Sequence, residues 1–131
     1  MINYFSKYKF IFYFCNLILF LEYLYPGSLL GCIIFNNCSI QPQLTSDFII
    51  SANHFYSFLI LSVVGFLTYM KVNQIIYLSI YLIFLSFFLE IMHYVIPNRS
   101  FEYPDLFGNV AGVILPIVIK LIFKKNENIK N

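Results

Sequence analysis

Apolar residues along the chain fall into four long blocks, separated by polar segments that contain proline. The blocks cover residues 10–25, 48–70, 75–96 and 106–123. Crossing a hydrocarbon layer of about 30 Å takes roughly 20 helical residues. The pattern therefore predicts an all-α membrane protein, a single domain built as a bundle of four transmembrane helices. The first block lacks a small-x-small cleavage site before Pro26, so we expect a retained span rather than a signal peptide.

The segments between the blocks predict how the helices are connected. Residues 26–47 carry Pro, Gly, Asn and Ser at short intervals, which is typical of a loop, with one short interfacial helix over Leu29–Phe35. The tight polar turn at residues 71–74 makes the second and third blocks a hairpin. Cys32 and Cys38 lie in the long loop, where they either form a disulfide, if the compartment is oxidising, or stay as two free thiols.

Composition supports a membrane location. Of the 131 residues, 60% are hydrophobic and 11% are charged, whereas a soluble domain carries about 25% charged residues. The formal net charge is +2, and we expect no nucleic-acid partner.

The cationic residues predict the orientation of the bundle. Arg99 is the one cationic residue on one side. The lysines gather on the other side, and they are Lys7, Lys9, Lys71, Lys120, Lys124, Lys125 and Lys130. Lysine and arginine concentrate in cytoplasmic segments. We therefore expect both termini, including the polar tail 124–131, to be cytoplasmic, and the loop 26–47 to be extracytoplasmic.

A layer of polar side chains is predicted near the outer face. Counted from the outer span ends at 1.5 Å per residue, each of the four helices places a polar group within roughly 5 to 9 Å of that face. These groups are Glu22, His54, Glu90, His93 and Asn109. Ionisable groups inside a membrane are costly, so such a layer indicates a functional site. No ionisable path crosses the midplane, which argues against a proton or cation carrier.

Several residues of this layer could bind a ligand or act in catalysis. The candidates for catalytic acid–base groups are His54, Glu90 and His93. The candidates for ligand binding are Arg99, Asp105, Asn109, His54 and Glu90. Arg99 suits a phosphate, although it could equally form an ordinary ion pair with Glu102 and Asp105.

Two other interpretations of the polar layer follow from residue types and spacing. Glu, His and Asp side chains suit a divalent metal, but no H-E-x-x-H or C-x-x-C spacing supports one, so we predict no metal and no cofactor. The layer could also be a hydrogen-bond network that only holds four helices together. Gly108-x-x-x-Gly112 allows close approach of another helix, and we expect packing inside the chain rather than a dimer interface.

The motif residues resemble those of the VanZ-like family of membrane proteins. E-x-x-H at 90–93, P-x-R-S at 97–100 and D-x-x-x-N-x-x-G at 105–112 are similar to that family's C-terminal signature. His54-Phe55 resembles the end of its upstream D-K-x-x-H-F motif. The chain departs from the family at Ile50 and Ser51, where Asp and Lys are usual, and at His93, where Gln is usual.

The resemblance implies a small, multi-pass protein of a bacterial plasma membrane. The family's name comes from a member linked to teicoplanin resistance, a role that we do not transfer to this chain. We weigh three functions. The first is binding of a membrane lipid or a lipid-linked cell-wall precursor by its headgroup, the second an intramembrane enzyme acting on such a lipid, and the third an assembly factor without a ligand. An obvious nucleophile beside the histidines is missing from the motif stretch, so we rank binding above catalysis.

Overall fold

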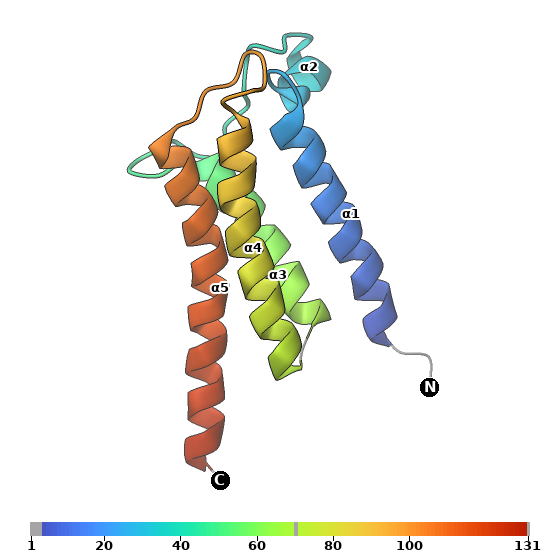
Figure 1. The fold of residues 1–131 in the computed structure, drawn as a ribbon, viewed down its shortest axis with the longest axis vertical. Coiled ribbons are helices and arrows are strands. Elements are labelled where there is room, and N and C mark those ends of the chain that lie inside the picture. Colours follow the sequence, from blue (N-terminus) through green and yellow to red (C-terminus); the bar gives the residue numbers. More distant parts are fainter. Residues whose placement is uncertain (1–3, 70, 131) are drawn as a thin grey trace.

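The computed structural model describes residues 4–69 and 71–130, with side chains for residues 9–69, 71 and 73–122. Within these residues the protein is all-helical, with five helices (Figure 1). They are α1 Tyr4–Leu24, α2 Leu29–Phe35, α3 Ala52–Thr68, α4 Val72–Met92 and α5 Tyr103–Lys130. The start of α1, the α3–α4 turn and the end of α5 lie at one end of the bundle, whereas α2 and the α4–α5 connection lie at the other. We call the latter the α2 end.

Two helices are long and apolar enough to cross a membrane, Asn73–Met92 and Tyr103–Ile122. Lys9–Leu24 meets the same test only together with Leu29–Phe35, which is bent away from it by 87°, so the number of such spans rises to three if this pair counts as one. Helix α3 is apolar but has 17 residues, about 25 Å at 1.5 Å per residue. The predicted all-helical class is thus confirmed, and two to three helices, rather than the predicted four, pass as candidate spans by length and composition.

The observed helix ends differ from the predicted blocks for local reasons. Asp47 accepts a hydrogen bond from the Ala52 amide (Oδ1···N 2.7 Å), so α3 begins only at Ala52 rather than at residue 48. Helix α4 ends at Met92, before the predicted limit of residue 96. Helix α5 continues through the segment predicted as a polar tail, up to Lys130.

The predicted short helix Leu29–Phe35 is present as α2. The Ser28 side chain caps its first turn by accepting a hydrogen bond from the Gly31 amide (3.0 Å), and Asn36 ends it in the left-handed conformation (φ 50°). Cys32 and Cys38 form a disulfide in the structure. The sequence left this pairing open, and the structure selects the bridged alternative.

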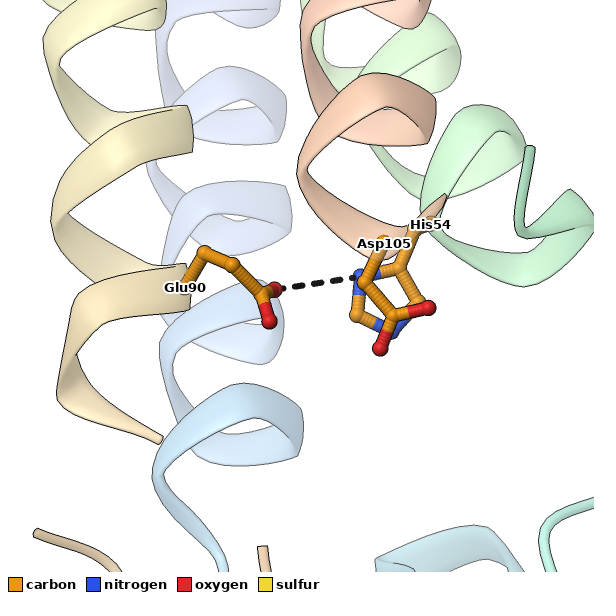
Figure 2. Close-up of side chains that lie close together, drawn as sticks. All are labelled: His54, Glu90 and Asp105. Atoms are coloured by element: carbon orange, nitrogen blue, oxygen red, sulfur yellow. Dashed lines mark ion pairs between the residues drawn. The ribbon is translucent and has the colours of Figure 1, made fainter. Parts of the chain in front are cut away.

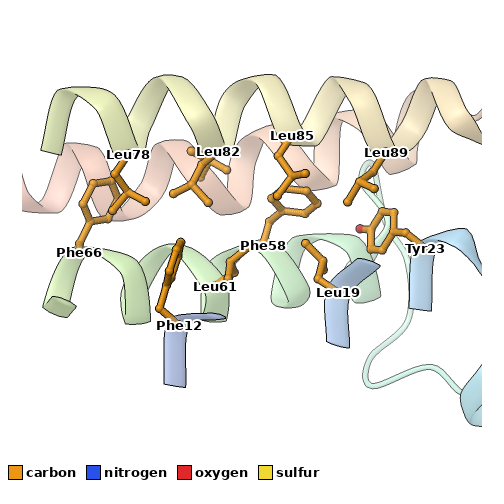
Figure 3. Close-up of a cluster of buried hydrophobic side chains, with 11 residues drawn as sticks. Phe12, Leu19, Tyr23, Phe58, Leu61, Phe66, Leu78, Leu82, Leu85 and Leu89 are labelled. Atoms are coloured by element: carbon orange, nitrogen blue, oxygen red, sulfur yellow. The ribbon is translucent and has the colours of Figure 1, made fainter. Parts of the chain in front are cut away.

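The hydrophobic core lies between α1, α3 and α4 (Figure 3). One face of α4 supplies leucines at a spacing of three to four residues, which is the helical repeat. They are Leu78, Leu82, Leu85 and Leu89, and their exposed fractions are 6, 0, 2 and 0%. Phe58 and Leu61 of α3 pack against them, with 0% and 1% exposure. This core fixes the helices whose ends build the polar site.

Glycines bring α5 against α3. A Cβ atom on Gly108 would lie 2.6 Å from the Ser51 carbonyl oxygen, and one on Gly112 would lie 2.8 Å from the Leu59 amide nitrogen. These neighbours are backbone atoms, so no side chain fits between the two helices. The expectation that this motif packs inside the chain is confirmed.

Candidate functional site

Polar side chains from four helices meet at the α2 end of the bundle. Figure 2 shows His54 of α3 and Asp105 of α5 side by side, with Glu90 of α4 directed toward His54. Asn109 of α5 and Tyr23 of α1 complete the group. Every one of these residues except Asp105 is at most 5% exposed. We call these five residues the polar cluster.

Hydrogen bonds fix the proton on the His54 ring. Asn109 donates from Nδ2 to the Ser86 carbonyl oxygen (3.4 Å), so its Oδ1 atom faces Tyr23 and His54 as an acceptor. Tyr23 donates its hydroxyl proton to that oxygen (2.5 Å). His54 Nδ1 lies 3.0 Å from the Tyr23 hydroxyl oxygen and 3.2 Å from Asn109 Oδ1. Because both neighbours of Nδ1 act as acceptors, Nδ1 carries the proton.

The other face of His54 meets a carboxylate. His54 Nε2 lies 3.3 Å from Asp105 Oδ2. With the proton on Nδ1, the Nε2 lone pair points at a carboxylate oxygen. Such a contact is repulsive unless a proton or a cation lies between the two atoms.

Glu90 is fully buried and uses its two oxygens differently. Oε1 accepts a hydrogen bond from the Glu102 amide (3.1 Å) and lies 3.3 Å from His93 Nδ1. Oε2 lies 3.7 Å from His54 Nδ1 and has no hydrogen-bond partner within the described part of the chain. His93 is also buried, and its ring stacks on Tyr23 with centroids 5.7 Å apart.

Arg99 does not pair with the acidic residues of its own turn but bonds to backbone carbonyls of another segment. Its Nε atom donates to the Tyr25 carbonyl oxygen (3.3 Å), and its Nη2 atom donates to the Glu22 carbonyl oxygen (2.7 Å). These carbonyls end α1, and a cation there complements the helix dipole. Burial lowers the pKa of the guanidinium, while Tyr23 and neighbouring carboxylates oppose that shift. The alternative of an ion pair with Glu102 or Asp105 is not formed among the described residues.

Two cavities open beside the cluster, and Arg99 lines both. The larger has a volume of about 390 Å³ and is predominantly polar. Its lining includes Ser28, His93, Arg99, Ser100, Glu102 and Asp105. The smaller, of about 240 Å³, lies against His54, Tyr23 and the loop residues Pro42 to Leu44. The α2 end therefore offers concave, polar space next to a half-buried cation.

The structure brings together most of the residues expected from the sequence. His54, Glu90 and Asn109 meet in the cluster together with Asp105, and His93 lies against Glu90. Glu22 contributes its backbone carbonyl to Arg99 and not its carboxylate to the cluster. Sequence reasoning missed Tyr23, because one tyrosine among 11 in an aromatic-rich span gives no signal of its own. It also missed the Ser86 carbonyl, which no side-chain pattern reveals.

None of the family models, curated proteins or solved structures compared with the chain matches it.

Proposed function

We propose that this chain is a four-span integral membrane protein of the cell envelope, of VanZ-like type, that binds the phosphate of a lipid headgroup at its α2 end. The observation that carries the proposal is the cavity of about 390 Å³ lined by Arg99 and His93. His93 Nε2 is buried and has no hydrogen-bond partner among the described residues. A buried polar atom beside a cavity calls for a partner that enters the cavity.

The outer surface of the helices supports insertion in a membrane. Opposite its leucine face, α4 presents large apolar side chains to its surroundings. They include Ile76, Ile80, Phe84 and Ile91, with exposed fractions of 53, 62, 65 and 54%. A helix that is apolar all round, yet not covered by protein, is typical of a lipid-facing span.

Two independent features support the orientation. The Cys32–Cys38 disulfide lies at the α2 end, and disulfides persist in oxidising compartments outside the cytoplasm. Lys71 precedes α4 at the α3–α4 turn, and Lys120 donates to the Phe66 carbonyl near the end of α3. Both therefore lie toward the opposite end, in agreement with a cytoplasmic location of positive charge. Together they support an outward-facing polar cavity.

Arg99 is suited to a phosphate because its guanidinium carries five N–H donors in a planar fork. Two of its nitrogens each donate to an α1 carbonyl, and the side chain still lines both cavities. The α1 contacts hold the guanidinium in place, so little side-chain entropy is lost when a phosphate binds. Ser28 lines the same cavity and adds a hydroxyl donor, since its oxygen only accepts from the Gly31 amide.

The serines near the histidines favour binding over catalysis. Ser57 donates to the Asn53 carbonyl oxygen (2.8 Å), and Ser100 donates to Glu102 Oε1 (3.1 Å). Neither hydroxyl is bonded to a histidine, as an activated nucleophile would be.

Lipid co-purification tests the proposal. Protein extracted in mild detergent is washed extensively, and its bound phospholipid is identified by mass spectrometry. We expect a near one-to-one phospholipid that is lost in Arg99→Ala and retained in Lys120→Ala. Lys120 is the matched control, because it too donates to a backbone carbonyl, that of Phe66 (3.2 Å). Equal phospholipid in both variants, or none in the wild type, would refute the proposal.

The orientation gives a separate prediction. In a background with Cys32 and Cys38 replaced by serine, a membrane-impermeant maleimide should label Ser100→Cys in intact cells. Asn128→Cys should react only after the membrane is permeabilised. Labelling of Asn128→Cys in intact cells would reverse the assignment of the two ends.

A further inference from the structure

The polar cluster contains more negative charge than its described neighbours balance. Glu90 is fully buried, and the Asp105 side chain is 20% exposed. The imidazole of His54 lies between them and is neutral in the tautomer assigned above. Arg99 makes its hydrogen bonds with the carbonyls of α1. Two carboxylates in such surroundings need a compensating positive charge or a proton.

The geometry of the three side chains fits a single cation. One ligand atom each from His54, Glu90 and Asp105 lies within 4.8 Å of the others. Zinc binds histidine nitrogen and carboxylate oxygen at about 2.0 to 2.2 Å, so two ligands of one tetrahedral ion lie roughly 3.3 Å apart. The distance from His54 Nε2 to Asp105 Oδ2 is 3.3 Å.

The lone pairs needed for coordination are available. In the neutral imidazole, His54 Nε2 is unprotonated when Nδ1 carries the proton toward Tyr23 and Asn109. Metal-binding histidines are typically oriented in this way, by a hydrogen bond from the other ring nitrogen. Glu90 Oε2 is buried and has no hydrogen-bond partner within the described residues. Oε1 accepts a hydrogen bond from the Glu102 amide, and Oε2 lies 3.7 Å from His54 Nδ1, so the Glu90 side chain must turn toward the Nε2 side of the ring to join the same ion.

In contrast to the sequence-based prediction of no metal, we infer that His54, Glu90 and Asp105 bind a divalent transition-metal ion, with zinc or manganese as the best match to one imidazole and two carboxylates. The ion neutralises the two carboxylates and replaces the repulsive contact between Nε2 and Oδ2 with two coordinate bonds. Three protein ligands leave at least one coordination position for water or another oxygen ligand. Because Asp105 also lines the larger cavity, that position lies close to the proposed headgroup site. The inference goes beyond the proposed function and does not depend on lipid binding.

Metal binding is tested on the full chain without lipid. Protein purified in detergent through a histidine-free tag is stripped with EDTA and titrated with zinc and with manganese. Bound metal is counted by elemental mass spectrometry, and the zinc edge is examined by X-ray absorption. We expect one ion per chain with nitrogen and oxygen ligands, and at least about 100-fold weaker binding in Asp105→Asn and Glu90→Gln.

Matched variants distinguish zinc binding by these three ligands from nonspecific zinc binding. Glu102→Gln lies in the same cavity but provides only its backbone amide to Glu90, so it should bind zinc as the wild type does. Tyr23→Phe removes a hydrogen bond to His54 Nδ1 and should weaken binding by about 10- to 100-fold. A folded wild-type chain that binds neither metal overturns the inference. So does equal loss of zinc in Glu102→Gln and Asp105→Asn.

Discussion

Gly112→Ala should lower the free energy of unfolding by about 1 to 3 kcal/mol. The added Cβ atom would lie 2.5 Å from the Phe55 carbonyl oxygen and 2.8 Å from the Leu59 amide nitrogen. Both are backbone atoms of α3, which cannot rotate away, so α3 and α5 must separate. Separation would disturb the α2 end, because His54 is on α3 and Asn109 on α5. Thermal melting and denaturation with SDS in mixed micelles measure the change.

Gly65→Ala is the matched control on α3. Its Cβ atom would lie 3.0 Å from Leu78 Cδ2 and 3.0 Å from Phe12 Cε2. The Leu78 atom is the end of a flexible side chain, and the gain in helix propensity, about 1 kcal/mol, offsets a small shift. We expect a change much smaller than that of Gly112→Ala. Equal melting temperatures for the two variants would contradict the packing of α3 on α5 described above.

Glu90→Ala should be the most destabilising change in the polar cluster, by about 3 kcal/mol or more. Without the carboxylate, the Glu102 amide and the Nδ1 atom of His93 lose the oxygen that they contact in the bundle. His54 also loses its nearest carboxylate neighbour on α4. Melting temperature in detergent, compared with that of the wild type, measures the loss.

Glu90→Gln separates the structural role of this carboxyl from its role as a ligand. The glutamine side-chain oxygen still accepts a hydrogen bond from the Glu102 amide, so we expect a loss of stability of about 1 kcal/mol. A neutral amide lacks the charge that a divalent cation requires, so this folded variant should lose zinc. If Glu90→Gln melts as low as Glu90→Ala, the charge itself is structural, and the cluster serves mainly to hold the helices.

The all-helical class was predictable because the apolar blocks are local features of the sequence. The limits of α3 were not, since they depend on the hydrogen bond from the Ala52 amide to Asp47. The depth count correctly grouped His54, Glu90 and Asn109 at one level, because helical rise is regular. The depth count could not show which atoms of these side chains face one another. The facing atoms decide between a hydrogen-bond network and a metal site.

Arg99 shows a different limit of sequence reasoning. Its position in a charged turn suggested partners close in sequence, Glu102 and Asp105. In the structure its partners are carbonyls 74 and 77 residues away, at the end of α1. Backbone carbonyls carry no sequence signature, so a role as a helix cap is visible only once the fold is known. The same hydrogen bonds hold the guanidinium beside the two cavities.

We propose above that Arg99 and the cavity beside it bind a lipid phosphate. The most direct measurement is calorimetric titration of the purified chain with a short-chain phosphatidylethanolamine and with the matching diacylglycerol, which lacks the phosphate. We predict saturable binding of the phospholipid alone, and loss of that binding in a folded Arg99→Lys variant, because a point charge cannot replace a planar fork. Equal binding of the two lipids, or wild-type binding by a folded Arg99→Lys variant, would contradict the claim.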